Sequence, residues 1–479
     1  MSSEFRKTRF HRPLATIEDP GRRRAMQAAL VGSACLAVGP LLGRPTLLDA
    51  WGNPIGSEET ASSDDALKAL REALLLGLRL VPVVGGVLSG LGALFIPRPG
   101  QSAEELWRAI VDQRISQAIF ELVKADLFGL TGVSQLYANA MRSGDFTQIA
   151  RQSIAANTQF VAAVPRFMQS GQEVALLPLF VIAASLHLAL LRDMALKASD
   201  LEFTEAYRRE IEQQASSCIA GYTAHVDKHV AAAIRKARLD NPYDWSKEGY
   251  SESNKPLAQM LEVKAGLQLN VIDVRDTWYA FDPVRHPGPV QVRLDREVFS
   301  SIIGRWDRRD MSPDTLPTWK PPASRLTALG LSTLSSPGGA RWLQGIYLRY
   351  EDGSEVETGR RGKSDGKKIL LSTDAYYFRA VNSWHQQGIA RLELPYLDKV
   401  FWAGDTPSPS DRTSSISYPE HRVSSMRSIG LGRSPADGSI GSMIVGFQLL
   451  NQTAVPMSLD AYDRLAPKIA PQLLRWISG

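Results

Sequence analysis

The side chains best able to hold a metal ion in this 479-residue chain are two histidines four residues apart, His225 and His229. On a helix this spacing places both imidazoles on one face, one turn apart, where they could share a metal. A stable site needs three or four ligands, and we identify no third ligand for this pair. We therefore expect neither a metal nor another cofactor.

A third histidine, His187, lies in the middle of an eighteen-residue run, residues 174–191, that contains no charged side chain. A neutral imidazole in such apolar surroundings must find a hydrogen-bond partner. We interpret His187 as a core residue whose ring nitrogens are satisfied, in preference to a pH trigger.

Enzyme motifs give no catalytic site. Gly362-Lys363-Ser364 imitates the end of a phosphate-binding loop, but position 357 is Glu where that motif requires glycine, and no hydrophobic strand leads into it. The chain contains no GxSxG, HExxH or CxxC sequence. We expect no enzymatic activity and interpret the basic residues around Gly366 as an exposed hairpin loop. These residues are Arg360, Arg361, Lys363, Lys367 and Lys368.

The uncharged run 174–191 has two possible environments. A helix that is apolar on every side lies either at the centre of a larger bundle or in a bilayer, and eighteen helical residues span about 27 Å, close to the thickness of a hydrocarbon core. The preceding segment, 144–168, is amphipathic, and no acidic residue occurs between Asp145 and Glu173. Its polar side contains Gln148, Arg151, Gln152, Gln159 and Arg166.

The positive charge of the chain is concentrated at its N-terminus. Residues 1–44 hold eight Lys and Arg against three acidic residues, which accounts for the whole formal charge of +5. The neutral remainder gives no support to a nucleic-acid partner. Arg22, Arg23 and Arg24 precede a mildly hydrophobic stretch and are typical of a twin-arginine export signal; a basic tail with a short buried helix is the alternative.

The remaining chain divides into two halves with different periodicity. Apolar residues recur at helical spacing from residue 64 to about 282, whereas short β-favouring runs separated by turn residues follow from 284, among them VQVRL at 290–294. We predict a multidomain α and β protein, and the predicted domains are a leader and linker at 1–50, a helical bundle at 51–283, an all-β domain at 284–455 and a C-terminal tail at 456–479.

Six segments resemble, in chain order, segments of the three-domain insecticidal crystal toxins, the δ-endotoxins. They are VPVVGGVLSGLGALF (81–95), DQRI (112–115), AAVPRFMQSGQEVALLPLFVIAASLHLALLRDMAL (162–196), YTAH (222–225), MLEVKAGLQLNVIDV (260–274) and VQVRLDREVFSSIIG (290–304). One such segment would be weak evidence, but six in the family's order are a specific signal. The resemblance implies a seven-helix bundle with an apolar central helix, followed by a β-prism.

The resemblance also implies a mechanism in which a helical hairpin, 144–168 with 174–191, enters target-cell membrane lipid as a homo-oligomeric pore. The residues it assigns to insertion and the pore are the five polar residues of 144–168 together with Leu176, Leu177, Phe180, His187 and Leu191. If the acid-free segment lines the pore, we expect weak cation preference or anion preference.

In the resembling toxins, loops of the β domain contact receptors, which makes Arg360, Arg361, Lys363 and Lys367 receptor-binding candidates. Some aromatic residues of the β half could stack on sugars, although we expect most of them in the core. We expect no third domain, because the sequence ends near the close of the second. The alternative function is a secreted, lectin-like β-prism protein whose helical bundle is only a scaffold.

Overall fold

The computed structural model describes residues 117–242 and 255–450 except for short gaps. The gaps are at 289, 291, 293, 305–314, 336–340, 360–366, 371–377, 379, 386–387, 397–398, 407, 410, 419–420 and 432–438. The predicted export leader and C-terminal tail therefore lie outside the described residues.

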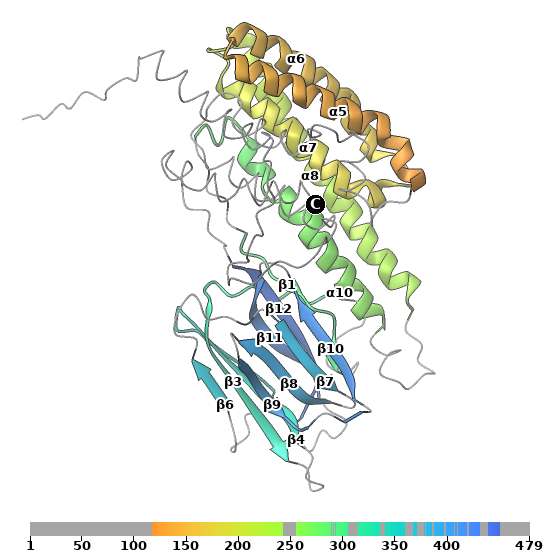
Figure 1. The fold of residues 1–479 in the computed structure, drawn as a ribbon, viewed down its shortest axis with the longest axis vertical. Helices are drawn as coiled ribbons and strands as arrows, with labels where there is room; N and C mark the ends of the chain where they lie inside the picture. Colours follow the sequence, from red (N-terminus) through yellow and green to blue (C-terminus); the bar gives the residue numbers. More distant parts are fainter. Residues whose placement is uncertain are drawn as a thin grey trace, which may run out of the picture.

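The first half is a bundle of long helices (Figure 1). Its elements are α5 (Gln117–Ser143), α6 (Phe146–Ala163), the 3₁₀ turn η1 (Val164–Met168), α7 (Glu173–Leu196), α8 (Glu205–Asp240), α10 (Lys255–Leu267), the π-helical η2 (Gln268–Ile272), α11 (Asp273–Arg275) and η3 (Trp278–Phe281). Side-chain caps fix two of the starts, because Asp145 accepts from the Gln148 amide and Thr204 from the Tyr207 amide.

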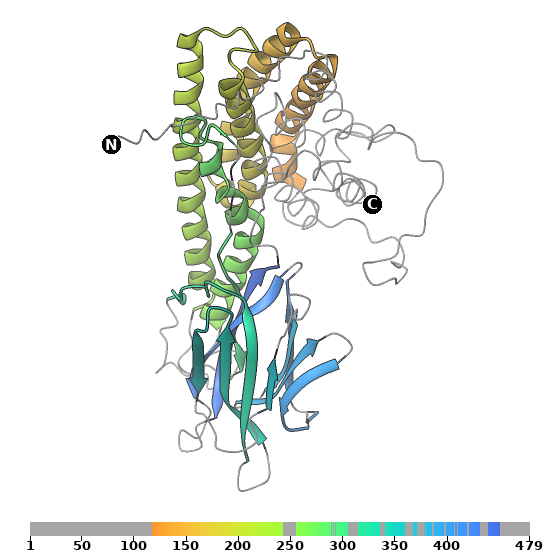
Figure 2. The ribbon, with the colours of Figure 1, turned by 90° about the vertical axis from the view of Figure 1, so that its left-hand side faces the viewer.

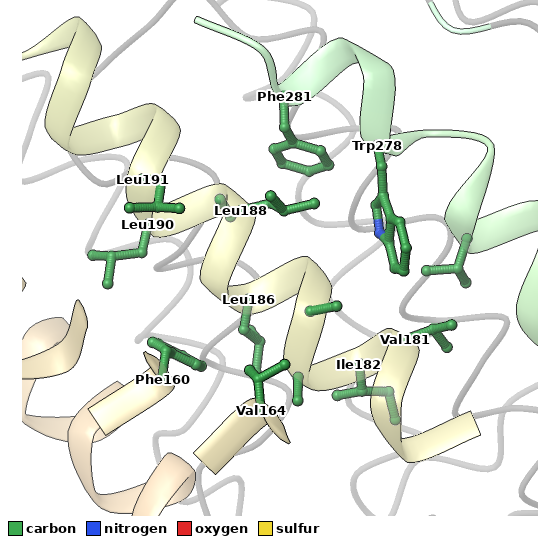
Figure 3. Packing of buried hydrophobic residues seen from close by; sticks show 14 of the residues in the cluster. Phe160, Val164, Val181, Ile182, Leu186, Leu188, Leu190, Leu191, Trp278 and Phe281 are labelled. Carbon is green, nitrogen blue, oxygen red and sulfur yellow. The ribbon is translucent and has the colours of Figure 1, made fainter. Parts of the chain in front are cut away.

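Helix α7 occupies the centre of the bundle. Every residue from Leu179 to Ala195 is buried, because neighbouring elements cover the helix on all sides. Figure 3 shows Phe160 and Val164 packed on one side of α7, with Trp278 and Phe281 on another. Most of the uncharged run 174–191 therefore lies within the core of this structure, whereas Val174 at its start is exposed. The centre of a bundle was one of the two environments expected for it.

The second half is all β and lies beyond one end of the bundle (Figure 2). Its strands are β1 (Val298–Phe299), β2 (Ile303–Gly304), β3 (Leu326–Ser335), β4 (Arg341–Tyr350), β5 (Glu355–Gly359), β6 (Lys367–Leu370), β7 (Ala380–His385), β8 (Ile389–Tyr396), β9 (Lys399–Gly404), β10 (Arg412–Ser417), β11 (His421–Leu431) and β12 (Ile440–Leu449).

These strands form three four-stranded antiparallel sheets. Their orders are β1–β12–β11 with β2 also on β12, β10–β7–β8–β9, and β5–β4–β3–β6. All three contribute to one apolar core, to which Leu348, Leu392 and Phe447 each belong. The predicted fold class, a helical bundle followed by an all-β domain, is confirmed. The shared core is the arrangement a β-prism requires, although within the described residues each strand pairs only inside its own sheet.

The predicted strand at VQVRL is wrong. The described residues of this segment belong to no strand, and the first strand pair of the β domain begins at Val298. The alternating Val290, Val292 and Leu294 are buried in the core of the helical bundle instead. Alternation therefore predicted which side chains are buried, but the described residues of the segment pack in the core of the bundle and belong to no strand.

The two halves contact each other through α10 and the β1–β12–β11 sheet. Leu257 and Leu261 of α10 pack with Phe299, Ile429 and Ile444 in a separate apolar cluster. Every residue of β12 is buried because the strand lies between this cluster and the core of the β domain. The sheet is thus buried on both of its sides, which ties the β domain to the bundle.

Candidate functional site

The hairpin formed by α6, η1 and α7 is the candidate functional site. Helix α6 turns Ile149, Ala156 and Phe160 inward, where they are buried. Its polar side faces outward: Gln148 and Arg151 are exposed. The predicted amphipathic pattern is therefore present, with the apolar side on α7 and the polar side away from it.

Two of the other predicted polar residues, Gln159 and Arg166, lie against α5. Gln152 and Gln159 are half-buried, and a Cβ at Gly129 of α5 would lie 2.7 Å from the Gln159 amide nitrogen, so the glycine permits this close approach. Arg166 in η1 is exposed and lies 4.0 Å from Asp126 of α5. Burial raises the pKa of Asp126, and the Arg166 charge opposes that shift.

A short turn joins the two helices. Gly171 adopts a φ of 83°, a left-handed conformation that glycine accepts without strain, and its amide donates to the Glu173 carboxylate over 2.8 Å. This carboxylate also lies in the first turn of α7, where it complements the positive end of the helix dipole. The turn therefore reverses the chain with local bonds alone.

His187 connects three helices from the middle of α7. Its Nε2 lies 2.9 Å from the Asn157 side-chain oxygen of α6, and its Nδ1 lies 2.8 Å from the Tyr222 hydroxyl of α8. The Asn157 oxygen can only accept, so Nε2–H donates to it and Nδ1 accepts from Tyr222. The ring also stacks on Phe160, with centroids 5.5 Å apart.

Both nitrogens of His187 are therefore satisfied, which confirms its interpretation as a core histidine. Burial lowers the pKa of His187 to about 3, so the ring is neutral at ordinary pH. The structure also identifies Asn157 and Tyr222 as site residues that the sequence did not predict. They lie 30 and 35 residues from His187 in the chain, and only the bundle brings them together.

Two further polar groups of α7 bond to segments outside the hairpin. The Trp278 indole donates to the Ser185 hydroxyl over 2.8 Å. Arg192 is buried and donates to the backbone oxygens of His286 at 3.0 Å and Gly288 at 2.6 Å. These bonds anchor α7 to the chain that leads into the β domain.

His225 and His229 lie side by side on α8, with ring centroids 4.5 Å apart. Burial and the neighbouring His229 lower the pKa of His225 to about 4, and its Nε2 is buried without a partner. No group of three or more metal-ligating side chains occurs in the described part of the chain. The pair alone does not make a metal centre.

The structure places the other predicted site residues as follows. Leu176, Leu177, Phe180 and Leu191 all lie on α7 and are fully buried. Lys367 begins β6, where its backbone pairs with Leu331. Arg360, Arg361 and Lys363, like Arg22, Arg23 and Arg24, lie outside the described residues. The hairpin residues are thus brought together, whereas Lys367 lies in the β domain.

By length and composition, α7 could cross a membrane. An eighteen-residue stretch of α7 has a mean hydropathy of 2.4, and α7 is the one helix among the described residues that meets such a criterion. A core helix of a soluble protein meets it as well, and 83% of the apolar stretch is buried here. Hydropathy alone does not distinguish a membrane-spanning helix from the buried central helix of a bundle.

Comparison with known proteins gives a consistent relationship. Residues 73–282 match the delta endotoxin N-terminal domain. Pesticidal crystal protein Cry1Ic of Bacillus thuringiensis is 27% identical over 282 residues, which cover 52% of this chain and 37% of the relative. Cry1Id of the same species is 28% identical over 246 residues, which cover 48% of this chain and 32% of that relative. The chain thus spans about a third of the length of these relatives.

Solved structures share the fold. The insecticidal delta-endotoxin Cry8Ea1 of Bacillus thuringiensis has a TM-score of 0.58 at 18% identity, covering 81% of this chain and 74% of that one. A structure of PirB has a TM-score of 0.61 at 16% identity, covering 82% of this chain and 96% of that one. In both, the likeness includes most of the bundle and the β domain.

Proposed function

Because its helical half is a delta endotoxin N-terminal domain and its two halves share the fold of the crystal toxins, this chain is a member of the delta-endotoxin family, and we propose that it is a pore-forming toxin. Its α6–α7 hairpin leaves the bundle and enters the target membrane as a unit. The names of the relatives support an insecticidal activity.

The observation that carries this proposal is the pairing of α7 with α6. Helix α7 exposes an apolar side chain in almost every direction once its neighbours are removed, which suits lipid. Helix α6 joins it through a turn of local bonds and has an exposed polar side without carboxylates. In the proposed pore, α7 faces lipid or neighbouring hairpins, and α6 faces water.

One hydrogen bond between the two helices of the hairpin supports movement as a unit. The bond between His187 and Asn157 lies within the hairpin and travels with it. The bonds from Tyr222 to His187 and from Trp278 to Ser185 cross to other elements and must break. Each such bond contributes about 1 kcal/mol, and Ser185 keeps its second bond to the Val181 oxygen of its own helix.

One hairpin cannot enclose a water-filled path, so the proposed pore is a homo-oligomer in membrane lipid. The polar wall residues in this proposal are Gln148, Arg151, Gln152, Gln159 and Arg166. Surface recognition by the β domain, with Arg360, Arg361, Lys363 and Lys367 as receptor candidates, and export through Arg22, Arg23 and Arg24 are parts of the same proposal.

The test locks the hairpin to α5, which stays behind. Arg166 and Asp126 are replaced by cysteines in a background with Cys35→Ser and Cys218→Ser, and a short bifunctional maleimide joins them. We expect dye release from liposomes to fall at least tenfold on cross-linking, measured against the same protein before cross-linking. A matched control joins cysteines at Gln169 and Gln172 inside the turn, which should leave release unchanged.

Undiminished release from the locked protein would show that the hairpin does not insert. Should the unaltered protein release no dye, even after limited trypsin treatment, the pore itself is wrong and the bundle is a scaffold for a binding domain.

A further inference from the structure

The β10–β7–β8–β9 sheet has an outer side that faces solvent. Alternation along the strands turns Leu392 and Ala403 into the core, whereas Val400 and Trp402 are 48% and 37% exposed. Four paired positions form a row across the sheet on this outer side (Figure 1 gives the strand order). From edge to edge they are Ser415, Asn382, Glu393 and Trp402.

An ion pair holds the aromatic end of this row in place. The Arg391 guanidinium lies over the Trp402 ring, 4.2 Å from its centroid, and its Nε donates to Glu393 over 2.7 Å. Both charged side chains are less than one-fifth exposed. The indole is therefore fixed on one side by a cation whose charge a neighbouring carboxylate neutralises.

The other end of the row is polar and uncharged. The Ser415 hydroxyl donates to the Asn382 side-chain oxygen over 2.7 Å, which orients the amide. Thr413 and Ser417 of the same edge strand are exposed as well. Neighbouring strands lie about 4.8 Å apart, so three spacings place Ser415 about 14 Å from Trp402.

We propose that this outer side of the sheet is a binding platform for a neutral oligosaccharide. A sugar ring presents a face of C–H groups, which fits the negative face of an indole, and a rim of hydroxyls that both donate and accept hydrogen bonds. Trp402 supplies the stacking surface. Glu393 and Asn382 supply an acceptor and an amide at fixed positions beside it, and the row is long enough for more than one ring.

The charge and the apolar area of this surface favour a neutral oligosaccharide over an anionic ligand or a protein partner. A sulfated sugar or an anionic lipid headgroup needs a cation to pair with, and here Arg391 is already paired with Glu393. Stable protein interfaces have a broad apolar centre and cover about 800 Å² on each partner. The exposed large apolar side chains described on this side are Val400 and Trp402. The platform rests on the proposed function, because it supplies the surface recognition that precedes insertion.

The test measures binding of the full chain to immobilised mannose-, galactose- and N-acetylhexosamine-terminated oligosaccharides and to a sulfated galactoside. We expect at least one neutral oligosaccharide to bind and the sulfated one to bind no better. Trp402→Ala should weaken that binding at least tenfold. Tyr347→Ala is the matched control, because Tyr347 is an aromatic on the outer side of the β5–β4–β3–β6 sheet; it should bind as the unaltered protein does.

Unfolding midpoints establish that each variant folds. If Trp402→Ala does not fold, Asn382→Ala is used for the binding test instead. Absence of neutral-sugar binding, or unchanged binding by both variants, overturns the platform. Dye release by the unaltered protein from sugar-free phosphatidylcholine vesicles is scored separately. Release without sugar binding would leave the pore standing and remove the platform, whereas sugar binding without release would do the reverse.

Discussion

Arg296, in the segment that enters the β domain, forms a paired hydrogen bond with the fully buried carboxylate of Asp273 at the end of the helical half. Its Nε donates to Oδ1 over 2.8 Å, and a second bond joins its terminal nitrogen to Oδ2. The remaining guanidinium nitrogen lies 2.8 Å from Nε2 of His421 on β11. One ion pair thus joins the bundle to two parts of the β domain.

Removing the acid from this pair should destabilise the protein strongly. In Asp273→Asn the guanidinium loses its counter-charge while it stays largely buried, and breaking such a pair costs about 3–5 kcal/mol. Urea unfolding followed by tryptophan fluorescence measures the loss. Lys236→Ala removes an exposed ion pair of α8 and should have little effect. Similar midpoints for the two variants would contradict the prediction.

His187 should make the bundle sensitive to acid. Its folded pKa lies near 3 and its unfolded pKa near 6.5, so the unfolded state binds the extra proton between these values and stability falls as pH decreases from 6.5 to 3. At about 1.4 kcal/mol for each pKa unit, the loss of stability on going from pH 6.5 to below pH 3 is of the order of 4–5 kcal/mol. His187→Phe should be less stable than the unaltered protein at pH 7, because Asn157 and Tyr222 lose their partner.

The difference between the two proteins should then narrow as pH falls, because phenylalanine cannot be protonated. Urea midpoints at pH 7 and pH 4 give the comparison. A difference independent of pH would mean that His187 does not set the acid response.

Glu297 should make the β domain sensitive to base. Its Oε1 accepts from the hydroxyls of Ser424 and Ser425, but Oε2 is buried without a partner, and burial raises the pKa of the carboxyl above its ordinary value. The neutral acid is favoured in the folded state, so stability is greatest below the unfolded pKa and falls as pH rises through the folded one.

Glu297→Gln keeps the shape of the side chain and removes the ionisation. We expect the variant to gain stability relative to the unaltered protein as pH is raised from 5 to 9, measured by thermal unfolding of both. A constant difference across this range would show that the carboxyl does not titrate there.

The pore should select weakly between ions. The proposed wall contains Arg151 and Arg166 but no carboxylate, so we expect reversal potentials in planar bilayers that indicate weak cation preference or anion preference. Arg151→Glu should move the selectivity toward cations. Arg209→Glu, on the outside of α8, should leave it unchanged. Strong potassium selectivity in the unaltered protein would contradict this assignment of the wall.

The central helix could be predicted because composition alone identifies it. A helix of eighteen uncharged residues fits the centre of a bundle or a bilayer and few other environments. Helix α7 contains all eighteen of these residues. The C-terminal end of this helix could not be predicted from composition. Arg192 and Asp193 close the uncharged run, yet the helix continues to Leu196 because Arg192 remains buried with backbone oxygens as its partners.

Strands were predicted where a β-favouring run is separated from the next by turn residues. The runs at 342–350, 389–396 and 442–450 coincide with β4, β8 and β12, whereas β3, β9 and β10 were not predicted. Strand β10 gives no apolar run, because its outward residues are Ser and Thr. An edge strand of this kind is defined by its pairing with β7, which no local pattern reveals. The partners of His187 were missed for a related reason, since contacts over 30 residues depend on how helices pack.

Arg192 links the hairpin to the segment that leads into the β domain. This one side chain of α7 holds the backbone at His286 and Gly288, within the only covalent connection between the bundle and the β domain. In the proposed insertion α7 leaves with Arg192, so this connection loses both hydrogen bonds in the same step. The β domain stays joined to the bundle through the Arg296–Asp273 pair and through the α10 cluster, so insertion removes one tether and leaves the others in place.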